Sequence, residues 1–539
     1  MVHWLRTAFG WLLAVATIAN AFLWVACGGS PLNNNPAIDS GADAPPSDAG
    51  PLPDVVRQRS CSLGDGGVDP QGVKLVASPT PFALGVTTDG YAIYNDRKFS
   101  LIYAVPLQGG IPEQIGPSWD SSSTVVSIAG SVVFYWTGVR DSTKAPTLGQ
   151  LIVWTAAGRS KTVATSSFLG MMAVHNSGKL IAYSDNATAT YPDPDAGADG
   201  GTSGVGTTDI YVSASNGTQA VIVANKVPWS VECQPSLSFV GDQLVVASCA
   251  SAKLPQPAAT IRAYRAPWTL GTVLNTQPAY TGIGHDQVRI LYQTANFNLV
   301  AQNVMSGAPV PVAPNVATAI LTNDGKSVVY LLGNGWVVRS SVTLAGSWQL
   351  ISMGPYADLK GLSSDDKWLI APKKFDSNPN SPLYGLYDIH LLPNAPNSTS
   401  VPLLTSTTGA FLNDWFTTDN AYVIFGANNK PAAYGYYGDF ASVPLATPNA
   451  APLTVSNTVW SAYATKGSKT VYNDGYEIVF PSLPTADIQV VDVANPGKRT
   501  KLASHADANF YLSPDKTKAL YSWAYCADDR AGLYLVDLP

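Results

Sequence analysis

The sequence predicts an all-β protein, a β-propeller of four-stranded blades, and three observations lead to this prediction. The composition, with Gly 46, Pro 40, Trp 14 and Tyr 25 among 539 residues, is typical of turn-rich β structure rather than of helical bundles. Short polar turns recur along the chain at a nearly constant spacing. After each turn comes a β-branched or aromatic run, such as Val132–Tyr135 or Ser327–Tyr330, as expected of a β-strand.

The turns divide the chain from about residue 73 to 539 into ten units with a mean spacing of about 47 residues, and one propeller blade spans roughly 40–50 residues. Ten units are compatible with one large ring, with two fused rings, or with seven to eight true blades and miscounted loops. The last unit stops at Pro539 after its third strand, and the isolated run Val73–Ala77 could supply the missing outer strand. The turn centres are Asp89, Gly130, Ser177, Gly241, Asp286, Asp324, Asp365, Asp419, Gly467 and Asp515.

Two motifs carry a resemblance to a known repeat. Asn509–Lys516 contains Ser-Pro-Asp-Lys, and Leu533–Asp537 reads Leu-Tyr-Leu-Val-Asp. Together they resemble the TolB-like, WD40-related propeller repeat, whose general form is Ser-Pro-Asp-Gly-Lys, a strand, and then Ile-Tyr-apolar-apolar-Asp. The likeness extends over about residues 73–539 and implies a propeller. No small α/β domain precedes the blades as it does in TolB itself, so the resemblance does not transfer a TolB role.

The first residues have the pattern of an export signal. Met1–Arg6 carries one positive side chain, Thr7–Ala26 is almost entirely apolar or small, and Cys27 follows directly after alanine. This order resembles the bacterial lipobox, although Trp24 stands where leucine is usual. The sequence thus predicts a lipoprotein signal peptide over 1–26 with lipidation of Cys27; an uncleaved anchor and simple secretion are the alternatives. Residues 27–58, rich in Pro, Asp, Ala and Gly, predict a disordered tether, and residues 59–539 predict the propeller body.

The charge balance limits the partners. Lys and Arg number 31 against 37 Asp and Glu, so the net charge of −6 offers no basic excess to neutralise phosphates, and a nucleic-acid partner is not expected. The expected location is the bacterial cell envelope, at the outer membrane on its periplasmic or surface side. Contact with the membrane would be through the N-terminal lipid, and we expect a monomer.

Four cysteines remain after Cys27, and in an exported chain they suggest two disulfides. Cys233 and Cys249 lie symmetrically about the turn at Gly241, so they should face each other across one hairpin. Cys61 precedes the candidate closing strand and Cys526 lies in the last unit, so a bond between them would hold the two ends of the body together. Four unpaired thiols are the alternative.

Catalytic motifs are absent from the sequence. There is no Gly-x-Ser-x-Gly motif, and the histidines in the body share no spacing typical of a metal site or a catalytic triad. The loop with Asp193, Asp195 and Asp199 loosely resembles a calcium loop, but its composition matches that of the tether. No cofactor is therefore expected, with Ca²⁺ as the one alternative.

Long insertions repeatedly fall between the second and third strands of the units, and in a propeller these loops emerge on one face. We therefore expect a non-catalytic scaffold that binds an envelope protein or a glycan through this face. The alternatives are an envelope lyase or glycosidase with its site in the central pocket, and a structural spacer. The insertions are residues 138–149, 185–208, 251–259, 373–386, 427–439 and 524–531. The candidate binding residues are Tyr384, Asn428, Asn429, Tyr434, Tyr436 and Tyr437.

Overall fold

A computed structural model describes residues 63, 66–96, 101–116, 126–140, 148–190, 205–230, 235–249, 259–268, 271–277, 280–285, 288–294, 296–305, 308–342, 347–353, 357–374, 386–408, 415–432, 435–477, 485–526 and 528–539. The predicted signal peptide, Cys27 and the tether lie outside these ranges. Among the described residues, no helix is long and apolar enough to cross a membrane.

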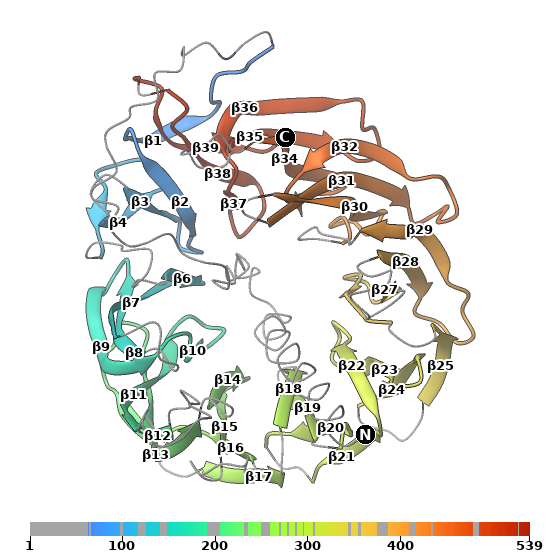
Figure 1. Cartoon of the computed structure of the whole chain (residues 1–539). Coiled ribbons are helices and arrows are strands. Elements are labelled where there is room, and N and C mark those ends of the chain that lie inside the picture. Colours follow the sequence, from blue (N-terminus) through green and yellow to red (C-terminus); the bar gives the residue numbers. More distant parts are fainter. Residues whose placement is uncertain are drawn as a thin grey trace, which may run out of the picture. The chain divides into compact units, whose positions relative to one another are not determined.

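The described chain consists of antiparallel sheets in which consecutive strands pair as meanders, the blades of a β-propeller (Figure 1). Within the described ranges there are ten sheets, nine with four strands and one, β30–β32, with three. In that sheet an isolated bridge between Phe416 and Val423 takes the place of the first strand. The predicted fold class is confirmed, and the alternative of seven or eight blades with miscounted loops is wrong.

The described residues divide into two compact units, the first formed by residues 126–352 and the second by residues 63–116 together with 353–539. Each unit contains five of the sheets. The strands of the first unit are β6 (Val126–Ala129), β7 (Val132–Arg140), β8 (Leu148–Thr155), β9 (Arg159–Phe168), β10 (Met172–Val174), β11 (Leu180–Thr190), β12 (Val205–Ala214), β13 (Val221–Ser230), β14 (Ser236–Val240), β15 (Gln243–Cys249), β16 (Ala259–Tyr264), β17 (Gly271–Gln277), β18 (Tyr280–His285), β19 (Arg289–Thr294), β20 (Leu299–Asn303), β21 (Val310–Ala313), β22 (Val316–Leu321), β23 (Ser327–Leu332), β24 (Trp336–Ser341) and β25 (Ser347–Ser352).

The second unit takes strands from both ends of the chain. Its strands are β1 (Val73–Ala77), β2 (Pro81–Val86), β3 (Tyr91–Asp96), β4 (Leu101–Pro106), β5 (Glu113–Gln114), β26 (Gly361–Leu362), β27 (Trp368–Lys374), β28 (Leu386–Pro393), β29 (Val401–Thr408), β30 (Tyr422–Ala432), β31 (Gly435–Pro444), β32 (Leu453–Val459), β33 (Ala462–Ala464), β34 (Lys469–Glu477), β35 (Thr485–Asp492), β36 (Arg499–Asp507), β37 (Phe510–Leu512), β38 (Lys518–Trp523) and β39 (Gly532–Asp537).

Apolar side chains between neighbouring blades form the core of each unit. In the first unit, one cluster spans three consecutive blades and joins Phe168 of β9 to Ile210 and Trp229 of the next blade and to Phe239 and Val246 of the blade after that. In the second unit, Ile389 and Leu391 of β28 share a cluster with residues of β30 and β31. Strands that are buried on both faces need apolar residues at consecutive positions, which explains runs such as Val132–Tyr135, every residue of which is buried.

The predicted turns lie between the first and second strands of the blades, and four of them share one hydrogen-bond pattern. In the turn after β37, Ser513 Oγ donates to Asp515 Oδ1 at 2.6 Å, and the backbone N–H of Lys518 donates to Ser513 Oγ at 2.9 Å. A Ser or Thr followed two residues later by Asp makes the same bonds in the other three turns. Those pairs are Thr322 with Asp324, Ser363 with Asp365, and Thr417 with Asp419. The Ser-Pro-Asp motif is thus an Asx-type turn that fixes a hairpin.

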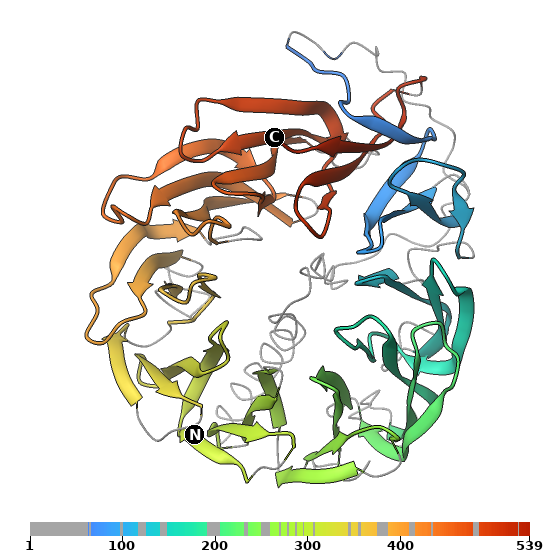
Figure 2. The same ribbon diagram turned by 180° about the vertical axis from the view of Figure 1, so that it is seen from behind.

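The last blade is completed by β1, as predicted. β1 pairs antiparallel with β39, with Val73 opposite Leu535 and Ala77 opposite Gly532. Figures 1 and 2 show the blue strand β1 beside the red strand β39 from opposite sides. We call residues 68–77, which include β1, the closing segment.

The closing segment is bonded to two further strands of the unit. The N–H of Gln71 donates to Leu502 O and the N–H of Ser504 donates to Val68 O, both at 2.9 Å, and Tyr521 Oη donates to Gln71 O at 2.6 Å. Asp69 accepts a hydrogen bond from Arg530 at 2.7 Å. Backbone groups at the edge of β39 and along β36 are thereby satisfied.

We expect Leu75→Ala to lower the free energy of unfolding by about 2–5 kcal/mol, because Leu75 is 7% exposed and packs against Leu520 and Leu533. Urea denaturation of the full chain measures the change. Val73→Ala on the same strand is the control, since Val73 is 64% exposed and its truncation should change stability by less than about 0.5 kcal/mol. Equal effects of the two variants would contradict burial of β1 against the last blade.

We expect low pH to remove the stability that Asp324 and Asp515 contribute through the hydrogen bonds of their turns. Hydrogen bonds from Ser513 and Thr517 hold the pKa of Asp515 below its ordinary value, and bonds from Lys326 and Thr322 do the same for the pKa of Asp324. A carboxyl group whose pKa is lower in the folded than in the unfolded protein stabilises the fold at pH values above its unfolded pKa, which is about 4. That contribution is lost as the pH falls through the folded pKa.

Asp515→Asn should therefore show a smaller drop in the urea midpoint between pH 6 and pH 3 than the unaltered protein, because an amide does not titrate. Asp89→Asn is the matched control, because in the corresponding turn after β2 the Thr87 hydroxyl donates to Tyr91 O, whereas the Ser513 hydroxyl donates to Asp515. A drop of the same size in Asp515→Asn and in the unaltered protein would contradict the assignment.

Candidate functional site

The predicted insertions lie between the second and third strands of their blades. Residues 138–149, 185–208 and 251–259 fall at the β7–β8, β11–β12 and β15–β16 connections. Residues 373–386, 427–439 and 524–531 fall at the β27–β28, β30–β31 and β38–β39 connections. Three other blades have short connections at this place, β3–β4, β19–β20 and β23–β24.

Four long hairpins have a bulge in the second strand of the blade: three of the predicted ones and the β34–β35 hairpin, which was not predicted from the sequence. Each bulge contains one residue with positive φ: Gly138 (60°), Asn186 (53°), Asn428 (51°) or Gly475 (64°). The strand register shifts at each of these positions. Asparagine and glycine adopt this conformation at the least steric cost, and a bulge bends the strand beyond it. The hairpin tips are therefore redirected at these positions.

In two blades an asparagine in the bulge is bonded to an aspartate on the third strand. Asn186 Nδ2 donates to Asp209 Oδ2 at 2.9 Å, and Asn428 Nδ2 donates to Asp439 Oδ2 at 2.6 Å. Asp209 Oδ1 also accepts a hydrogen bond from the N–H of Lys226 at 2.8 Å. The Asp209 side chain on β12 is therefore bonded to both neighbouring strands, β11 and β13. Sequence reasoning missed this bond, although an Asn in the second strand and an Asp in the third are visible in both repeats.

Aspartates on the second strand fix the hairpins to the preceding blade. Asp185 Oδ1 accepts the backbone N–H groups of Thr165 and Ser166 of β9, both at 2.9 Å. Asp474 Oδ1 accepts a hydrogen bond from Thr458 Oγ1 of β32 at 2.8 Å. The hairpin bases are thus held by charge-assisted hydrogen bonds, which are stronger than neutral ones.

Only part of the predicted binding set is described. Tyr437 is half-buried, and it lies directly across from Lys430, whose Nζ is 6.0 Å from its ring centroid. Asn428 is exposed, but its amide nitrogen is bonded within the hairpin. Tyr384 and Tyr434 lie outside the described residues, as do the side chains of Asn429 and Tyr436.

The β38–β39 connection carries a dense polar and aromatic cluster. Arg530 bonds Asp528 Oδ2 through Nη2 at 2.7 Å and bonds Asp69 through Nη1, while its guanidinium lies 5.2 Å from the Trp523 ring centroid. Bonding to Arg530 holds the pKa of Asp528 below its ordinary range. The charges are paired with one another, so this cluster attaches the closing segment to the last blade.

The cysteine pairings stay predictions. Cys526 is buried in a cluster that also contacts Leu63, two residues from Cys61. Cys61, Cys233 and the side chain of Cys249 lie outside the described residues. Cys249 closes β15, with its backbone opposite Ala259.

The histidines that can be placed have separate surroundings. His175 Nδ1 is 2.7 Å from Ser177 Oγ, and His505 stacks on Tyr525 with ring centroids 4.3 Å apart. Burial lowers the pKa of His390. In the part of the chain that the structure describes, no three His, Cys, Asp or Glu side chains are grouped to hold a metal ion. The predicted calcium residues Asp193, Asp195 and Asp199 are outside that part, as is the side chain of His285.

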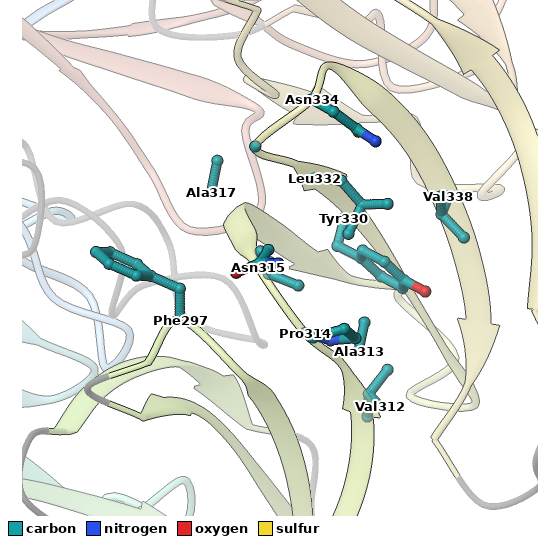
Figure 3. A pocket seen from close by; sticks show the side chains of 12 residues that line it. Phe297, Val312, Ala313, Pro314, Asn315, Ala317, Tyr330, Leu332, Asn334 and Val338 are labelled. Carbon is teal, nitrogen blue, oxygen red and sulfur yellow. The ribbon is translucent and has the colours of Figure 1, made fainter.

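A pocket of about 720 Å³ lies in the first unit, between the β18–β21 and β22–β25 blades. Figure 3 shows it extending across the β21–β22 connection, from Phe297 at one end to Leu332 and Val338 at the other. Its rim comes from the β19–β20 and β23–β24 turns, the short connections between second and third strands. The pocket therefore opens at the blade edge from which the long hairpins of this unit also emerge.

No protein-family model matches the sequence, and no curated protein sequence matches it. Solved structures match at low identity, each covering part of this chain. The tricorn protease matches at 11% identity and TM-score 0.32 over 85% of this chain and 52% of its own, so this chain spans about half of that protease. An oligogalacturonate lyase from Vibrio parahaemolyticus matches at 11% identity and TM-score 0.30, covering 66% of this chain and 97% of its own. A putative TolB from Agrobacterium tumefaciens matches at 13% identity and TM-score 0.24, covering 52% of this chain and 98% of its own.

Proposed function

We propose that this protein is a non-catalytic binding scaffold of the bacterial cell envelope that holds a protein or glycan partner with its long hairpins. The difference between the two edges of the blades carries the proposal. At one edge the strands are joined by tight turns, four of which are closed by Ser/Thr–Asp hydrogen bonds. At the other edge most of the hairpins are long, and four of them are bent by bulges.

Rigid bases with extended tips suit recognition of a partner. The β11–β12 and β30–β31 hairpins continue beyond their bulges as paired strands, up to Thr190 opposite Val205 and Ala432 opposite Gly435. Preorganised elements lose less entropy on binding than flexible loops do. On the β30–β31 hairpin, Lys430 and Tyr437 offer a cation and an aromatic ring side by side, and tyrosine is enriched in binding hot spots.

The N-terminal sequence supports placement at the envelope. The apolar run before Cys27 followed by a Pro- and Asp-rich segment resembles a lipid-anchored stalk. A stalk of this kind would leave the hairpins free to meet a partner at a distance from the membrane.

We expect replacement of residues 428–438 by Asn-Gly to abolish partner capture and leave the fold intact. Ala427 and Asp439 are paired in β30 and β31, so a two-residue type I′ turn can join them. No side chain described between Asn428 and Tyr437 belongs to a core cluster, and the urea midpoint should therefore change little. Capture is measured by affinity purification of residues 59–539 from envelope extract, with partners identified by mass spectrometry.

Lys466→Ala is the control, because Lys466 is exposed in the tight turn after β33, at the other edge. If the variant with the shortened hairpin still captured the partner and Lys466→Ala did not, the proposed binding edge would be wrong. Turnover of a polysaccharide by the purified protein would replace the scaffold proposal with the envelope-enzyme alternative.

We expect Cys27→Ala to abolish lipid labelling and move the protein from the membrane fraction to the soluble fraction. Incorporation of radiolabelled palmitate and fractionation of the expressing cells measure the two effects. The mass of the unaltered mature protein gives a second readout, because lipoprotein processing removes residues 1–26. Retention of residues 1–26 with membrane association of Cys27→Ala would identify an uncleaved anchor.

A further inference from the structure

The pocket of the first unit is a built feature rather than a gap between mobile loops. The N–H of Val316 donates to Phe297 O, and the N–H of Gly333 donates to Asn315 O, both at 2.8 Å. These bonds tie the β21–β22 connection to the β19–β20 turn on one side and to the β23–β24 turn on the other. Three segments that are separate in sequence are thereby held as one rim.

Two non-glycine residues on this rim have a left-handed backbone. Phe297 has φ of 59° and Asn315 has φ of 53°. The conformation is unusual for phenylalanine, and residues held in such conformations concentrate at ligand sites. It leaves the Phe297 side chain 60% exposed at the end of the pocket, although a large aromatic group normally gains free energy from burial.

The lining is neutral and combines apolar surface with amides. Phe297, Val312, Pro314 and Leu332 supply apolar surface, and none of the described residues that line the pocket is charged. Asn315 and Asn334 add exposed amide groups, each with a donor and an acceptor. Asn334 Oδ1 accepts the N–H of Trp336 at 3.2 Å, which orients this side chain.

This chemistry distinguishes among ligand classes. An anionic ligand would find no cation among the lining residues, and a purely apolar ligand that covered Asn315 and Asn334 would displace water from their exposed amides without replacing its hydrogen bonds. The edge strands β21 and β22 both lie at the pocket, and a peptide added as a strand to β21 would meet Pro311 and Pro314, which supply no N–H donors. A neutral sugar offers both an apolar ring face for Phe297 and paired hydroxyls for the amides.

We propose that this pocket binds a neutral carbohydrate, with Phe297 as the stacking surface and Asn315 and Asn334 as hydrogen-bonding groups. The inference rests on the proposed binding function, since it names the ligand class of one site at the hairpin edge. It depends on different residues from those of the β30–β31 hairpin, so the two proposals can fail separately.

The test is isothermal titration of residues 59–539 with cellohexaose, maltohexaose and chitohexaose. Hexagalacturonate serves as the charged counterpart and a proline-rich decapeptide as the peptide counterpart. We expect at least one neutral hexasaccharide to bind, and Phe297→Ala and Asn315→Gly each to weaken it at least tenfold. Glycine preserves the positive φ at residue 315, so that variant removes the amide without straining the turn.

Two matched variants control for indirect effects. Ile111→Ala truncates an apolar side chain in the second unit that is 92% exposed, more than Phe297 is. Asn397→Gly makes the same change at another asparagine of positive φ, 54°, away from the pocket. Both should bind the hexasaccharide as the unaltered protein does, and the urea midpoint of every variant shows that it is folded.

Three results would overturn the carbohydrate site: no binding of any neutral hexasaccharide, binding of hexagalacturonate or the peptide alone, or neutral-sugar binding that Phe297→Ala and Asn315→Gly leave unchanged. Capture of an envelope protein through the β30–β31 hairpin would in each case leave the scaffold proposal standing. Sugar binding that survives shortening of that hairpin and is lost in Phe297→Ala supports the pocket independently.

Discussion

The second unit depends on the pairing of β1 with β39. The last blade contains only three strands from the C-terminal part of the chain, and an unpaired β39 would expose a row of backbone donors and acceptors. β1 satisfies that edge, and the residues before it bond to β36 as well. Arg530 adds a charged contact by bonding Asp69 while its guanidinium lies over Trp523. Main-chain pairing, side-chain packing and charge therefore act together where the closing segment meets the last blade.

Most of the fold could be predicted because each blade repeats its turn chemistry. A turn such as Ser513–Asp515 predicts a hairpin from the sequence alone, because its hydrogen bonds are local. The strand supplied by Val73–Ala77 was predictable for a different reason, because the last repeat ends one strand short. The β30–β32 sheet departs from the four-stranded pattern, with the Phe416–Val423 bridge in place of a first strand. This departure was not predicted from the sequence.

The candidate site was less predictable, because its features depend on contacts across strands and blades. The insertion positions could be read from the lengths between strands, whereas the Asn186–Asp209 and Asn428–Asp439 bonds depend on cross-strand register. The pocket could not be predicted at all. Phe297, Asn315 and Asn334 are unremarkable turn residues in the sequence, and only the bonds between three connections make them one surface. The positive φ of Phe297 cannot be predicted from the composition or from the hydrophobic periodicity of the sequence.

The discontinuity of the second unit has a consequence for the order of folding. Residues 126–352 follow one another in the sequence, so all five blades of the first unit are available once residue 352 has emerged. The second unit begins with β1 but needs β39, more than 450 residues later, before its edges are satisfied. Contacts of such long sequence separation form late and slowly. A chain that stops short of its last strand therefore keeps β1 unpaired, and its early strands remain open to aggregation until synthesis is complete.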